Sequence, residues 1–159
     1  MRLYFLRHGQ AGERDDWHGD DFDRPLTTDG IKRMEREADT MAELDLELDA
    51  IVTSPLVRAR QTAEIVAKRL KLRKTLVEDG DLGLEFDVSR LQRIVEKFPK
   101  ANAIMLVGHD PTMSRTIGQL IGGARIDFKK GALACVDLTN DSAPAGELVW
   151  LIPPRVLSH

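Results

Sequence analysis

The sequence predicts a three-layer α/β/α sandwich with a mostly parallel sheet. Short apolar runs alternate with segments whose apolar residues recur every three or four positions, which is typical of alternating strands and helices. The clearest apolar runs lie at residues 2–6, 48–54 and 103–107. Two further runs close the chain without a helical segment between them, and we expect this pair to add an antiparallel element at one edge of the sheet.

The first predicted strand covers residues 2–6, RLYFL, and is expected to be buried. Residues 10–25 are polar and acidic, and they predict a loop. A helix follows within residues 24–44, and Thr27, Thr28 or Asp29 is expected to cap its N-terminus. The apolar positions at helical spacing are Ile31, Met34, Ala38, Met41 and Ala42.

The second strand lies around residues 48–54 and leads directly into a helix that ends near Leu70. Ser54 is expected to be the N-cap of this helix and Pro55 its first residue, since each residue type is favoured at that position.

The second half of the chain repeats this alternation. Residues 75–77 predict a short strand, and residues 87–98 an amphipathic helix. A buried strand at 103–107 is followed by a polar corner, a proline and a helix that ends at glycines. The last two predicted strands, LACVDL and ELVWLIP, are joined by a turn over 139–146.

Length and composition restrict the class of protein. The 159 residues fit one domain, which we expect to span 1–159. A net charge of −3 argues against a nucleic-acid partner, and no apolar run is long enough to span a membrane. The N-terminal apolar run is too short for a signal peptide, so the expected location is the cytoplasm.

Cationic and imidazole side chains follow three of the predicted strands. Arg7 and His8 come after the first strand, Ser54 and Arg58 after the second, and His109 after the strand at 103–107. Because ligands bind at the carboxyl ends of parallel strands, we expect these side chains to lie at one edge of the sheet. Guanidinium groups match phosphate oxygens two at a time, so the cluster predicts a phosphoryl ligand.

Each of these signals has an ordinary structural explanation when it is taken alone. An Arg-His pair at a strand end is commonly a surface pair, a histidine after a strand is commonly structural, and Arg58 resembles other solvated helix charges. The coincidence at equivalent strand ends favours a functional site.

The segments LRHGQA, TSPLVRARQTAEI and LVGHDP resemble, in order, the three signature segments of the histidine phosphatase superfamily. RPLTTDG also resembles a segment of the small bacterial SixA-type phosphohistidine phosphatases. The resemblance implies the histidine-phosphatase (phosphoglycerate-mutase-like) fold. The short stretch between the helix ending near Leu70 and the 87–98 helix leaves no room for a large helical lid.

The resemblance also implies residue roles. His8 would be the nucleophile that carries the phosphoryl group, and Arg7, Arg58 and His109 would bind its non-bridging oxygens. No metal and no cofactor is implied.

Many superfamily members place a general-acid carboxylate near this chain's residues 78–81. Asp81 is the best match here, while Asp79, Glu78 and solvent remain open as proton donors.

The implied activity is removal of phosphate from phosphohistidine on a protein, such as a His-containing phosphotransfer domain. Two alternatives are a phosphatase of small phosphomonoesters and a phosphate-binding adaptor without turnover. The acidic loop is expected either to meet a basic protein surface or to be simply solvated. Its carboxylates are Glu13, Asp15, Asp16, Asp20, Asp21 and Asp23.

Other phosphatase chemistries are excluded by spacing. The sixth residue after Cys135 is Asp141 instead of an arginine, so the loop of cysteine-dependent phosphatases is absent. The segment GQLIGGAR has the glycines of a P-loop and lacks its lysine.

Overall fold

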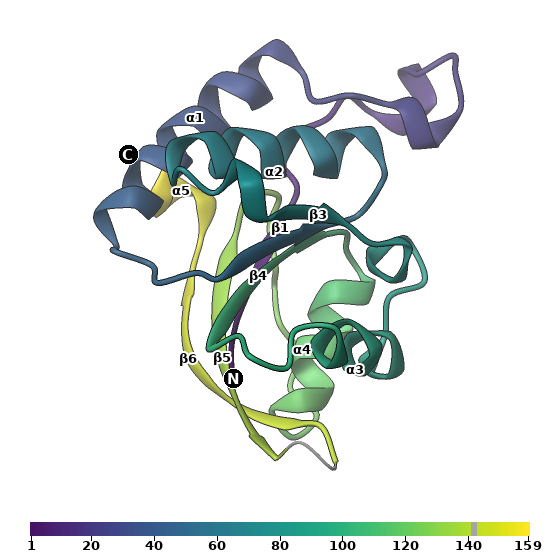
Figure 1. The fold of residues 1–159 in the computed structure, drawn as a ribbon. Coiled ribbons are helices and arrows are strands. Elements are labelled where there is room, and N and C mark those ends of the chain that lie inside the picture. The colour runs from purple at the N-terminus through teal and green to yellow at the C-terminus, as the bar shows by residue number, and fades with distance from the viewer. Residues whose placement is uncertain (141–142) are drawn as a thin grey trace.

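The computed structural model describes residues 1–140 and 143–159, which form a six-stranded sheet between two layers of helices (Figure 1). The strands are β1 (Arg2–Arg7), β2 (Ala50–Thr53), β3 (Leu76–Glu78), β4 (Ala103–Gly108), β5 (Leu133–Asn140) and β6 (Ala145–Ile152). The α-helices are α1 (Thr28–Glu43), α2 (Val57–Arg69), α3 (Val88–Glu96), α4 (Thr112–Leu120) and α5 (Pro154–Leu157). Short 3-10 helices lie at η1 (Arg14–Asp16), η2 (Asp21–Asp23), η3 (Arg73–Thr75) and η4 (Gly80–Leu82).

The strand order is β3-β2-β4-β1-β5-β6. β3, β2, β4 and β1 pair in parallel, and β5 and β6 add an antiparallel pair at the edge beyond β1. This topology confirms the predicted sandwich and its antiparallel edge. Part of the turn predicted over 139–146 lies outside the described residues.

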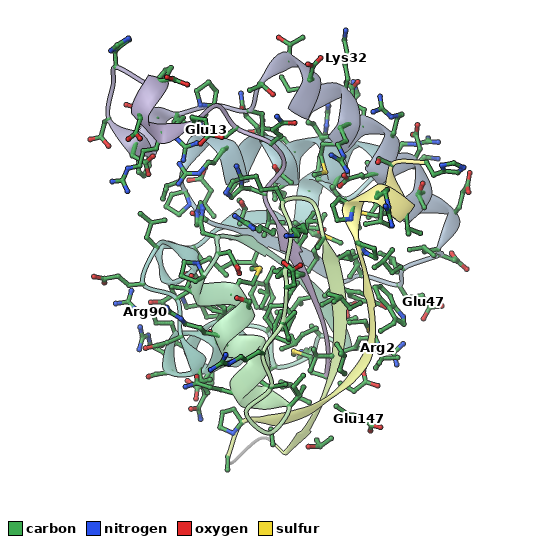
Figure 2. The ribbon with its side chains drawn as sticks, turned by 180° about the vertical axis from the view of Figure 1, so that it is seen from behind. Arg2, Glu13, Lys32, Glu47, Arg90 and Glu147 are labelled. Atoms are coloured by element: carbon green, nitrogen blue, oxygen red, sulfur yellow. The ribbon has the colours of Figure 1, made fainter. Side chains whose placement is uncertain are left out.

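The two helical layers cover opposite faces of the sheet. α1, α2 and α5 lie on one face, and α3 and α4 lie on the other (Figure 1). Figure 2 shows Lys32 on the first layer and Arg90 on the second. Alternate residues of β1 serve both cores, because Leu6 packs with α1 and α2 whereas Phe5 packs with α3 and α4.

The start of α1 packs directly on the chain that follows β1. Thr27 is the N-cap, since its hydroxyl accepts a hydrogen bond from Gly30 N at 2.9 Å. A Cβ at Gly30 would lie 2.1 Å from Gln10 O, so only glycine allows this close approach. The contact ties the first turn of α1 to the segment after β1.

The predicted start of the second helix is wrong by two residues. α2 begins at Val57, and Leu56, the residue before it, has an extended backbone. Ser54 therefore does not cap α2, and Pro55 lies in the turn that precedes it. The Ser54 hydroxyl accepts from Leu56 N at 3.2 Å within this turn.

Figure 1 shows the segment between β1 and α1, which contains η1 and η2, extending beyond the body of the sheet. Figure 2 labels Glu13 on this segment. Within residues 1–140 and 143–159, no helix is long and apolar enough to cross a membrane.

Candidate active site

The carboxyl ends of three neighbouring strands form the floor of the candidate site. β4 lies between β1 and β2, with Arg7 paired to Gly108 and Thr53 paired to Val107. The residues that follow continue this pairing, because His8 N donates to Gly108 O at 3.0 Å. The rings of His8 and His109 consequently lie with their centroids 5.3 Å apart.

His8 is held in one tautomer. Its side chain is buried, with 5% of the residue exposed, and Nδ1 lies 2.7 Å from Gly9 O. A carbonyl oxygen only accepts, so Nδ1 carries the proton and Nε2 carries the lone pair. Burial and the neighbouring His109, Arg58 and Arg7 lower the pKa of His8 well below its usual value, against the effect of the Gly9 carbonyl. The imidazole is therefore neutral at pH 7.

Thr62 connects the segment that carries His8 and Gly9 to α2. Its buried hydroxyl accepts from Gly9 N at 3.0 Å and donates to Arg58 O at 2.8 Å. No sequence pattern predicted a role for Thr62. The available signal is its position four residues after Arg58, which places both on one side of the helix.

Arg58 is buried, with 4% of the residue exposed, and it contacts the acidic loop. Its Nη1 donates to Asp21 O at 2.8 Å, and its Nη2 lies 3.2 Å from Asp21 Oδ2. Burial lowers the pKa of Arg58, and Asp21 partly offsets this effect. Arg60 is more exposed and lies 3.4 Å from Glu78, so the two arginines of the RAR segment have different surroundings.

Asp21 makes a second contact beside the candidate site that no sequence pattern predicted. The sequence predicted it only as one member of the acidic loop, whereas the structure pairs it with Arg58 and, at 3.0 Å, with Arg24 Nε. Burial favours protonation of Asp21, but the hydrogen bond from Arg24 and the charge of Arg58 outweigh it and lower its pKa. Asp21 is therefore an anion beside the site.

His109 and Arg7 complete the cluster. His109 Nε2 lies 2.7 Å from Ser54 Oγ, and burial together with the charge of Arg58 lowers the pKa of His109 to about 4. Arg7 Nη1 donates to Phe128 O at 2.7 Å. Burial lowers the pKa of Arg7 as well.

Three nitrogens of this cluster are buried and have no hydrogen-bond partner among the described residues. They are Arg7 Nε, Arg58 Nε and His109 Nδ1. Two guanidinium charges and unsatisfied nitrogens around a neutral imidazole suit an anion with several oxygens.

Asp81 lies in η4, and its contacts lead away from this cluster. Its carboxylate is 2.7 Å from Arg93 Nη2 on α3, and this hydrogen bond lowers its pKa. The carboxylate of Asp79 accepts a hydrogen bond from Lys97 Nζ on the same side, at 2.6 Å. An ionised Asp81 has no proton to donate at neutral pH.

In the part of the chain that the structure describes, no three His, Cys, Asp or Glu residues lie close enough together to hold a metal ion.

The family model described as "Histidine phosphatase superfamily (branch 1)" matches residues 3–83, just over half of the chain. The chain belongs to this superfamily. The match confirms the resemblance on which the sequence analysis relied.

Relatives extend this similarity over most of the chain. An uncharacterized protein of Picosynechococcus sp. (strain ATCC 27264 / PCC 7002 / PR-6) is 42% identical over 143 residues, covering 84% of this chain and 82% of that protein. The phosphohistidine phosphatase SixA of Escherichia coli (strain K12) is 27% identical over 161 residues, covering 97% and 94%. A solved structure of the protein histidine phosphatase SixA complexed with tungstate has a TM-score of 0.87 at 26% identity and covers 99% of both chains.

These similarities confirm the predicted fold, and together they support a phosphatase hydrolase. Between α2 and α3 the described residues form only β3, η3 and η4, so this stretch contains no large helical lid.

Proposed function

We propose that this protein removes the phosphoryl group from phosphohistidine on a protein, through a covalent phosphohistidine at His8. The observation that carries the proposal is the buried, neutral His8, whose Nδ1 proton is held by Gly9 O beside Arg58 and His109. The similarity to SixA supports the substrate class.

In the first step, the lone pair of His8 Nε2 attacks phosphorus in line with the leaving group. A nitrogen–phosphorus bond forms at His8, and the phosphorus–nitrogen bond of the substrate breaks, with its electron pair returning to the substrate imidazole. Arg7, Arg58 and His109 bind the non-bridging oxygens and offset their charge. In this proposal the Ser54 hydroxyl accepts from Leu56 N and donates its own proton to His109 Nε2, so that His109 Nδ1 carries the N–H that binds the phosphoryl group.

In the second step, a water molecule attacks the phosphorus of phospho-His8. The bond to Nε2 breaks, its electron pair returns to the imidazole, and inorganic phosphate leaves with the oxygen of the water. The proton released by the water passes to the phosphate or to solvent. The proposed reaction uses no metal and no cofactor.

The proton for the leaving group comes from solvent in this proposal. Asp81, the acid carried over from the family pattern, is ionised by Arg93. A substrate imidazole leaves as a neutral molecule once its nitrogen is protonated, whereas an alkoxide requires a positioned acid. The surroundings of Asp81 therefore favour a phosphoramidate over an alkyl phosphate.

The proposed partner is a phosphorylated protein, such as a His-containing phosphotransfer domain. The absence of a large lid in the described stretch between α2 and α3 supports a substrate that is part of a bulky molecule. We also propose that residues 1–159 act as one domain. The cytoplasmic location stays a prediction.

The deciding experiment compares kcat/KM for a phosphorylated His-containing transfer domain with kcat/KM for a panel of small phosphomonoesters. We expect the phosphoprotein to be strongly preferred. A preference for one of the small esters would favour the alternative phosphatase, and failure to hydrolyse even an aryl phosphate would favour an adaptor.

The His8→Ala variant is the control for the mechanism. The variant should fold, because His8 lies at a strand end. It should have no turnover, because it lacks the proposed nucleophile. Wild-type enzyme quenched during turnover should carry acid-labile label on His8. Label on another residue would contradict the covalent step.

A further inference from the structure

A cavity of about 440 Å³ adjoins Arg7 between α1 and the segment that precedes β5. Four cationic side chains line it. One comes from β1, one from α1 and two from the segment before β5. They are Arg7, Arg33, Lys129 and Lys130. One of them, Lys129, has its own counterion in Asp127 at 3.1 Å. The remaining positive charge makes this cavity suited to an anion.

The acidic residue that lines the cavity is Glu37, which is buried with 1% exposed. Burial raises the pKa of Glu37 to about 8, although Arg33 and Arg36 oppose the shift. At neutral pH this side chain is therefore mainly a neutral carboxyl with a proton to donate. The raised pKa reduces the extent to which Glu37 offsets the charge of the cations that line the cavity.

Two buried polar atoms of the residues that line the cavity lack hydrogen-bond partners among the described residues. Glu37 Oε2 and Arg33 Nε are both buried, and neither has a hydrogen-bond partner in the residues that the structure describes. Arg33 Nε lies 3.4 Å from Glu37 Oε1, within ion-pair distance. Arg33 and Glu37 are thus close enough to attract each other, although Arg33 Nε and Glu37 Oε2 make no hydrogen bond. An anion in the cavity would add a partner for the Arg33 guanidinium.

The cavity is attached to the strand end that carries the proposed nucleophile. Gly131 has φ +84°, and its N–H donates to Arg7 O at 3.1 Å and to His8 O at 3.2 Å. A Cβ at Gly131 would lie 2.6 Å from Glu37 Oε2, so the carboxyl packs directly against this turn. Arg7 thus belongs both to the catalytic cluster and to the cavity wall.

We propose that this cavity is a second anion subsite, which binds an acidic side chain of the phosphoprotein next to its phosphohistidine. The inference rests on the proposed function, and it adds a preference for substrates with Asp or Glu near the phosphorylated residue. The acidic loop contacts the proposed catalytic cluster at Arg58, through the carboxylate of Asp21. The two sides of the site therefore carry opposite charge, which would orient a substrate with a matching distribution of charge.

The test uses phosphohistidine peptides in which one flanking position at a time is Glu, Gln or Lys. At the position that reaches the cavity, we expect kcat/KM to be about tenfold higher for Glu than for Gln, the size of one charge-assisted contact. Lys should be the poorest residue there. Arg33→Gln and Lys130→Gln, made separately, should each reduce the ratio of Glu to Gln towards one.

Lys32→Gln is the matched control. Lys32 is an exposed cation next to Arg33 on α1, it does not line the cavity, and Figure 2 labels it at the outer surface. This variant should keep the wild-type ratio of Glu to Gln.

Equal kcat/KM for Glu and Gln peptides at every position would overturn the subsite and leave the phosphohistidine phosphatase intact. An unchanged ratio in both Arg33→Gln and Lys130→Gln would do the same. Failure to hydrolyse any of the peptides, with an aryl phosphate still hydrolysed, would overturn the proposed function and the subsite with it.

Discussion

Replacing Thr62 by valine tests whether α2 positions the nucleophile through Gly9. The change keeps the branched shape of the side chain and removes a hydroxyl that makes two hydrogen bonds, one from Gly9 N at 3.0 Å and one to Arg58 O at 2.8 Å. Arg58 O remains an acceptor within the helix. Gly9 N–H has no second acceptor among the described residues, so the variant leaves it buried and unpaired.

A matched substitution isolates the cost of that unpaired group. Thr116 is also buried in a helix, and its hydroxyl makes only the bond to Thr112 O at 2.8 Å. Thr62→Val and Thr116→Val therefore share the loss of one helical hydroxyl bond, worth about 1 kcal/mol. The additional cost in Thr62→Val is the unsatisfied Gly9 N–H, which amounts to ~1–3 kcal/mol.

Urea unfolding of both variants measures this difference directly, and hydrolysis of an aryl phosphate measures the effect on His8. If ~1.4 kcal/mol of the cost falls on the orientation of His8, kcat drops about tenfold. Thr62→Ser, which keeps the hydroxyl, should restore most of the activity. Equal destabilisation in the two valine variants, with wild-type kcat in Thr62→Val, would refute the positioning role.

Four further predictions concern the cluster and its surroundings. Arg58→Ala should lower kcat/KM for an aryl phosphate about 100-fold, which corresponds to the loss of ~3 kcal/mol of transition-state stabilisation. Arg60→Ala should keep a kcat/KM near that of the wild type. Equal losses in the two variants would show that the site is misplaced. Because the pKa of His109 falls from 6.5 to about 4 on folding, the unfolded chain binds this proton first. The free energy of unfolding should therefore decrease as the pH falls from 6.5 to about 4, and His109→Gln should flatten that slope in urea titrations. Activity should survive exhaustive treatment with EDTA, and loss that magnesium or zinc restores would argue for a metallophosphatase. Asp81→Asn should lower kcat/KM for alkyl, aryl and phosphohistidine substrates by the same small factor, whereas a selective loss with the alkyl ester would identify Asp81 as the acid.

The fold and the gathering of Arg7, His8, Arg58 and His109 were largely predictable because both follow from local patterns. Apolar runs of strand length, each ending in a polar corner before a helix, fix where Arg7, His8 and His109 emerge along the chain. The parallel arrangement then brings the strand ends together, as the pairing of β1, β4 and β2 confirms. The same logic places Arg58 on the first turn of α2, even though that helix begins two residues later than predicted.

The contacts that the sequence did not predict join residues far apart in the chain. Asp21 and Arg58 are separated by 37 positions, and Gly9 and Thr62 by 53. Neither pair belongs to a periodic pattern, so only the packed structure reveals it. The contact of Asp81 with Arg93, which favours the ionised carboxylate, is likewise not visible in the family pattern that suggested Asp81 as the acid.

In the proposed mechanism, the contact between Asp21 and Arg58 couples the acidic loop to the binding of the phosphoryl group. The carboxylate acts as a resident counterion, so the folded protein does not bear the full repulsion of its clustered cations while no phosphoryl group is bound. An arriving phosphoryl group has to share that guanidinium with the loop. Since coupling between two binding events is reciprocal, any factor by which Asp21 weakens the affinity for phosphate is also the factor by which phosphate loosens the loop. A phosphoryl group bound at the strand ends thereby weakens the attachment of the acidic loop, the segment between β1 and α1 that extends beyond the body of the sheet.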